Sequence, residues 1–65
     1  MTFFSILTGF IGRTVEVVVP NTLFEGTLTK VETTIIQVQE PSPIYGVLQF
    51  VNIPTNSIDY VRILA

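Results

Sequence analysis

The 65-residue chain contains no cysteine, no histidine and no tryptophan. Without cysteine it cannot form a disulfide scaffold. Without cysteine or histidine it cannot build a metal centre or a catalytic site of the kinds that depend on those two side chains. We therefore expect no cofactor.

Charged residues are also few, with three basic and five acidic side chains and a net charge of −2. The isoelectric point of about 4.6 excludes a basic protein that grips nucleic acid by bulk charge. Hydrophobic residues make up 48% of the chain, which excludes an intrinsically disordered polymer.

Targeting and membrane signals are lacking as well. The apolar stretch 1–11 has no positively charged start and no small-residue cleavage site. It is also much shorter than the roughly 20 residues that span a bilayer. We expect a cytoplasmic protein that does not enter a membrane.

Val, Ile and Thr, the β-branched residues that favour strands, supply 26 of the 65 residues. Alternation and turn residues predict strands over 13–19, 23–31, 35–39, 44–53 and 58–64. Gly26 and Gly46 lie inside two of these strands and predict sharp bends. Residues 54–57 predict a tight turn or one turn of 3₁₀ helix.

The first residues show a helical spacing of apolar side chains, and Gly12 is suited to end that helix. We expect this face to cover the open end of the sheet, although it could instead dock a partner. Its members are Phe3, Phe4, Leu7, Phe10 and Ile11.

Five strands with short links and glycine bends predict one all-β domain over 1–65, an antiparallel sheet closed into a small barrel. An OB-fold would place a helix where this chain has Pro-Ser-Pro, at 41–43. An SH3-like barrel would lack the N-terminal helix, so an Sm-like barrel fits best. A domain this small buries only about 60% of its unfolded surface, which predicts a homo-oligomer.

The pattern resembles the Sm/LSm family, and within it the short bacterial or phage-type members. The start of the first Sm motif resembles Gly-Arg-Thr-Val-Glu-Val at 12–17, and its middle resembles 23–28. The second motif resembles 53–61 without gaps. Three positions depart from the family: Thr34 replaces the base-stacking residue, Ile36 the base-reading Asn, and Pro54 the closing Arg. The resemblance therefore implies that the uridine slot is absent.

The resemblance also implies a homo-oligomeric ring in which the fourth strand of one copy pairs with the fifth strand of the next. The same residues could instead belong to the core of one subunit. The predicted interface comprises Leu48, Phe50, Asn52, Tyr60, Val61, Arg62 and Ile63.

A ring would repeat a weak basic patch in every subunit, so RNA or other single-stranded nucleic acid is a candidate partner. The alternative is a protein–protein scaffold in which the cations only form ion pairs with nearby acids such as Glu16, Glu32 and Asp59. Asn56 would then only stabilise the turn in which it lies. The candidate nucleic-acid residues are Arg13, Lys30, Thr33, Thr34, Thr55 and Asn56.

Enzyme chemistry has little support in the sequence. The five acids are spread one per strand or turn, and no spacing among them guarantees an acid–base pair. There is also no glycine-rich phosphate loop. We expect a protein that is not an enzyme.

Overall fold

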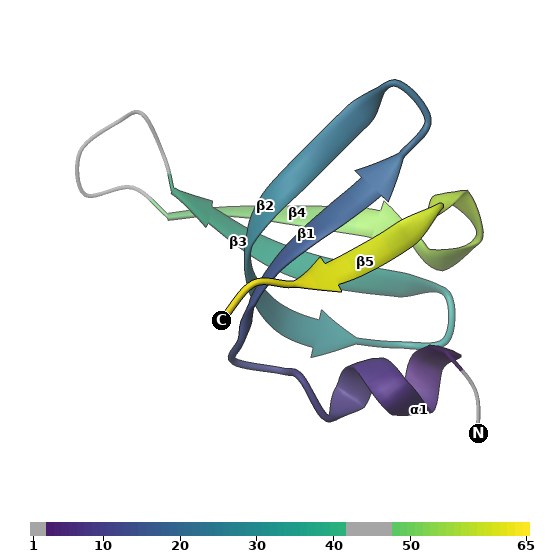
Figure 1. Cartoon of the computed structure of the whole chain (residues 1–65), viewed down its shortest axis with the longest axis horizontal. Helices are drawn as coiled ribbons and strands as arrows, with labels where there is room; N and C mark the ends of the chain where they lie inside the picture. Colours follow the sequence, from purple (N-terminus) through teal and green to yellow (C-terminus); the bar gives the residue numbers. More distant parts are fainter. Residues whose placement is uncertain (1–2, 42–47) are drawn as a thin grey trace.

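The computed structural model describes residues 3–41 and 48–65 (Figure 1). A short helix comes first, and five strands follow, with one 3₁₀ turn between the last two. The elements are α1 (Phe3–Thr8), β1 (Thr14–Val19), β2 (Thr22–Val31), β3 (Ile35–Pro41), β4 (Leu48–Pro54), η1 (Thr55–Ser57) and β5 (Tyr60–Ile63).

The strands form a single antiparallel sheet in the order β4-β3-β2-β1-β5. Four of them follow one another as hairpins, and β5 returns to the outer side of β1 (Figure 1). The all-β class, the antiparallel order and the N-terminal helix agree with the sequence prediction. The predicted closure does not: within residues 3–41 and 48–65 the sheet is open, with β4 at one edge and β5 at the other.

The core lies on one face of this bent sheet. Alternate residues of the three central strands are completely buried, as the period of a half-buried strand requires. Leu7 from the helix and Ile53 from β4 complete the buried cluster. The residues with no exposure are Val15, Val17, Leu28, Ile36 and Val38.

The bend predicted at Gly26 is present and has a clear steric cause. A Cβ at this position would overlap the Gln39 carbonyl oxygen and lie 2.8 Å from Val38 Cγ1. Only glycine lets β2 and β3 approach this closely. A register shift between Leu28 and Lys30 follows, so the ladder is irregular where the strand curves.

The helix is shorter and more exposed than the sequence pattern predicts. It ends at Thr8, and a turn continues to Gly12, whose φ of 94° is in the left-handed region that favours glycine. Only Leu7 is buried on it, and Phe3 is 45% exposed. The prediction that the Phe3 ring packs onto the sheet is therefore wrong. A helix of six residues is too short to bury more than one side chain against β2.

The remaining boundaries differ by a few residues. The 3₁₀ turn over Thr55–Ser57 matches the expected turn, and β5 begins at Tyr60 rather than at residue 58. The predicted bend at Gly46 and the predicted strand start at 44 lie outside the described residues. No helix among residues 3–41 and 48–65 is long and apolar enough to cross a bilayer.

Candidate functional site

The first candidate surface is the free edge of β4. Val51 and Ile53 turn towards the core, whereas Leu48, Phe50 and Asn52 project from the opposite face. Leu48 is 65% exposed and Phe50 is 50% exposed, which is high for large apolar side chains. The edge strand carries no charged residue. It therefore lacks the lysine that commonly protects such edges from pairing.

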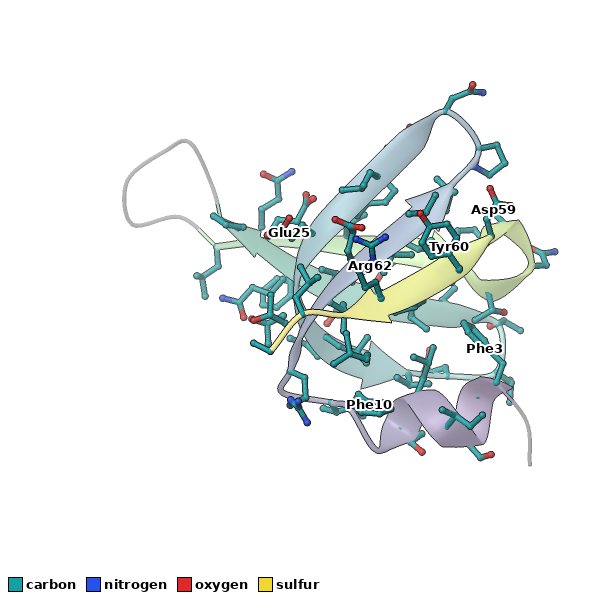
Figure 2. The ribbon with its side chains drawn as sticks, in the orientation of Figure 1. Phe3, Phe10, Glu25, Asp59, Tyr60 and Arg62 are labelled. Carbon is teal, nitrogen blue, oxygen red and sulfur yellow. The ribbon has the colours of Figure 1, made fainter. Side chains whose placement is uncertain are left out.

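The second candidate surface is the free edge of β5. Val61 and Ile63 are half-buried and pack against the core. Tyr60 and Arg62 lie on the other face, and Figure 2 shows both side chains on the same side of the strand. The Tyr60 side chain is 49% exposed. The structure thus places all seven predicted interface residues on the two edges of the open sheet.

A row of charges crosses the outer face from β5 to β2. Arg62 Nη1 lies 3.7 Å from Glu16 Oε1. Glu16 stands directly opposite Glu25 in the β1–β2 register. This carboxylate pair was not predicted from the sequence, although the Pro20–Asn21 turn between the strands fixes the register that creates it. Arg62 offsets part of the repulsion between the two acids.

A polar ladder crosses the same face and ends at the β4 edge. The Thr29 hydroxyl donates to Gln37 Oε1 at 3.1 Å, and Gln37 Nε2 donates to Asn52 Oδ1 at 3.1 Å. This chain of hydrogen bonds uses the Asn52 carbonyl oxygen.

The four polar loop residues chosen from the sequence lie together. Thr55 Oγ1 donates to the Thr33 carbonyl at 3.0 Å, and the Thr55 N–H donates to the Thr34 carbonyl at 2.9 Å. Asn56 follows in η1 and is exposed. The β2–β3 loop and the 3₁₀ turn thus form one polar corner, defined by Thr33, Thr34, Thr55 and Asn56.

The cations do not gather at this polar corner. Arg13 lies at the start of β1, where its Nε donates to the Ala65 carbonyl and its guanidinium lies 5.8 Å from the Phe10 ring centre. In Figure 1 this end of β1 lies beside the C-terminus, away from η1. Lys30 Nζ is 3.9 Å from Glu32 Oε2. Each of the three cations is thus next to an acceptor of its own chain, so the predicted basic patch is not assembled within one subunit.

A groove of about 640 Å³ lies between the β1–β2 turn and the end of β4. Its apolar lining includes Val19, Phe24 and Ile53. These three residues were not selected from the sequence as site residues, because they occupy ordinary strand positions. The rest of the lining comprises Asn52, Asn56, Ser57 and Asp59, together with Pro20 and Pro54.

Within the part of the chain that the structure describes, no group of three acidic, cysteine or histidine side chains is placed to hold a metal ion. The chain was also compared with known proteins. No family model, no curated protein and no solved structure matches it. The geometry of the two edges and the polar corner is therefore the basis for assigning a function.

Proposed function

We propose that this chain is a non-enzymatic scaffold that assembles with copies of itself through the free edges of β4 and β5 and closes into an Sm-like ring. The observation that carries the proposal is the open sheet, whose edge strands bear exposed Leu48, Phe50 and Tyr60. An unpaired edge with apolar side chains is a template for a further strand.

The core supports the same conclusion. Val51 on β4 and Val61 and Ile63 on β5 pack against the buried cluster but remain partly exposed at the two edges. A strand added at either edge would remove this apolar surface from water, which contributes about 25 cal/mol per Å². A 65-residue domain without disulfides has few other sources of stability.

The two edges are different surfaces, so a β4–β5 contact is heterologous. Contacts of this type close into a ring when the rotation between copies allows it, and otherwise extend into a filament. The strand order and the resemblance of the sequence to the Sm/LSm family both support the ring. The number of subunits would follow from the angle between neighbouring copies.

Size-exclusion chromatography with light scattering tests this proposal directly. A chain of 7.2 kDa should elute as a defined multiple of that mass over a wide range of concentration. A mass of one subunit at all concentrations would refute the assembly. A mass that grows with concentration without limit would refute closure into a ring.

A second candidate function is weak binding of RNA or other single-stranded nucleic acid at the polar corner. It is supported by the exposed side chains of Thr33, Thr34 and Asn56, which Thr55 holds together through its hydrogen bond to Thr33 and which a ring would repeat in each subunit. The internal partners of Arg13 and Lys30 favour the scaffold over this candidate.

Fluorescence anisotropy with labelled oligo(U), oligo(A) and DNA separates the two candidates. Phosphate binding should weaken steeply as salt rises. It should also weaken in a double variant with Arg13→Ala and Lys30→Ala. If no binding occurs at low salt while the oligomer remains intact, the nucleic-acid candidate is wrong and the scaffold stands alone.

A further inference from the structure

The backbone of β4 shows which of its groups are available to a partner. The Thr55 N–H donates to the Thr34 carbonyl, in the same register that pairs Ile35 with Pro54. Hydrogen-bonded pairs in an antiparallel ladder recur at every second residue. The groups directed away from β3 therefore belong to Leu48, Phe50, Asn52 and Pro54, and Pro54 has no N–H to donate.

The backbone groups of β5 alternate in the same way between β1 and the free edge. The Leu64 N–H donates to the Thr14 carbonyl at 2.8 Å, in the register that pairs Val15 with Ile63. Leu64 and Arg62 therefore direct their backbone groups to β1. The free edge of β5 offers the backbone groups of Val61 and Ile63.

The two edges thus present opposite faces of the sheet. The available residues of β4 carry exposed side chains on the outer face, whereas those of β5 carry half-buried side chains on the core face. Hydrogen-bonded partners in an antiparallel pair stand directly opposite, with both side chains on one side. An antiparallel contact would therefore place Leu48 and Phe50 of one copy against the core face of the next.

Resting on the proposed self-assembly, we infer that β4 pairs antiparallel with β5 of a second copy so that Phe50 faces the partner's Val61 and Leu48 faces the partner's Ile63. Leu48 and Phe50 then extend the partner's hydrophobic core. On the other face, Val51 stands opposite the partner's Tyr60, and Gln49 stands opposite the partner's Arg62. Each apolar side chain meets an apolar one, and the guanidinium meets an amide oxygen.

Shifting this register by two residues in either direction loses the match. One shift places Asn52 beside the partner's Val61 and Val51 beside the partner's Arg62, so that polar groups face apolar ones. The other shift places Phe50 beside the partner's Asp59. Burying a polar or charged group against an apolar one without a hydrogen bond is costly, so both shifts are disfavoured.

The direction of the edge strands agrees with an antiparallel contact. In a flat antiparallel sheet of five strands, the first and last strands run parallel. In this chain the arrows of β4 and β5 point in opposite directions in Figure 1, because the sheet twists strongly across its five strands. A ring that rotates each copy only modestly keeps these directions opposed.

The absence of cysteine in the natural chain makes disulfide trapping a clean test. A variant with Gln49→Cys and Arg62→Cys should form a ladder of cross-linked subunits under mild oxidation, since these non-hydrogen-bonded positions bring Cβ atoms close enough. The matched control carries Gln49→Cys and Tyr60→Cys. In the proposed register these two positions are offset by two residues and would face each other only in the shifted register, so the control should give at least tenfold less cross-linked product.

A second pair, Val51→Cys with Tyr60→Cys, repeats the test in case the first variant does not fold. Efficient cross-linking of the control, or cross-linking of neither test pair in an intact oligomer, would overturn the register. Light scattering of the reduced proteins separates this outcome from a failure of the proposed function, which would appear as a single-subunit mass for the unmodified chain.

Discussion

The three central strands and the two edge strands of this sheet use similar residues to opposite effect. In β1, β2 and β3, five valine, leucine and isoleucine side chains on the core face have no exposure. In β4 and β5 the core face is also packed, but Leu48, Phe50 and Tyr60 on the outer face are about half exposed or more. Both regions are apolar in sequence, but the edge strands leave large apolar side chains without partners in their own chain.

The comparison separates two sources of stability. The central strands bury their apolar surface in every copy, so their contribution does not depend on protein concentration. The exposed apolar side chains of the edge strands contribute only when another strand pairs with them, so that contribution follows mass action. Variants in the two regions should therefore differ in the size of the stability change and in whether that change depends on protein concentration.

The largest effect is expected from Gly26→Val, which places a side chain where the two central strands β2 and β3 approach closely. Its side chain would overlap the Gln39 carbonyl, which is backbone and cannot move aside. We expect loss of the cooperative unfolding transition in urea, followed by circular dichroism. Gly9→Ala is the control, because a Cβ there meets only Ile6 O at 3.5 Å; equal damage from both variants would contradict the steric account.

Leu28→Ala should have the next largest effect. Leu28 has no exposure, and truncation of a buried leucine costs about 2–5 kcal/mol. The loss should be the same at low and high protein concentration in urea titrations. Leu23→Ala lies on the same strand at a position that is 52% exposed, and should cost less than about 1 kcal/mol. If the two variants were equally unstable, the core would be misassigned.

Phe50→Lys should weaken assembly through the β4 edge without unfolding the subunit. The ring is half exposed in the single chain, so the folded subunit should change by no more than about 0.5 kcal/mol. The dissociation constant of the oligomer should rise by about tenfold or more, because burial of a phenylalanine contributes about 1.5–3 kcal/mol. Light scattering over a dilution series measures this rise.

Leu23→Lys provides the control for that experiment. It places the same charge on the same face of the sheet, but on the central strand β2. Assembly through the edges should tolerate it. Dissociation by both variants to the same degree would show that the outer face, and not the β4 edge, holds the copies together.

Arg62→Ala should have a smaller effect than these variants. The arginine is exposed and its pair with Glu16 is worth about 0.2–1 kcal/mol. The loss should shrink at high salt, because screening also weakens the repulsion between Glu16 and Glu25. Lys30→Ala, in a pair whose two side chains are both about half exposed, should cost less still. A loss that is independent of salt would point to packing instead.

Local patterns were enough to predict most of the secondary structure. Alternation, β-branched residues and turn residues located the strands, because each of these signals acts on its own backbone. Gly26 located the bend, although the steric reason for the glycine lies on the neighbouring strand. The helix was predicted only in part, since the spacing of apolar residues does not show how many of their side chains pack against the sheet. Closure of the sheet depends on whether the two edge strands, β4 and β5, pair with each other, and no local pattern predicts this pairing.

The candidate site shows the same division. Thr33 and Thr55 were assigned to one candidate site, and the structure brings them into contact, because each borders a strand end in one hairpin register. Arg13 was grouped with them through the resemblance to a family, whereas in this chain it binds the C-terminal carbonyl instead. The Glu16–Glu25 pair was overlooked because it is visible only after the β1–β2 register is known.

Pro54 also limits how far another strand can pair along the free edge of β4. Exposed apolar edges usually risk indefinite stacking of strands into fibrils. At the end of β4 the outward position is occupied by a residue without an N–H, and the 3₁₀ turn follows at once. The backbone donors of this edge therefore end at Asn52, so the C-terminal end of β4 cannot template a longer strand.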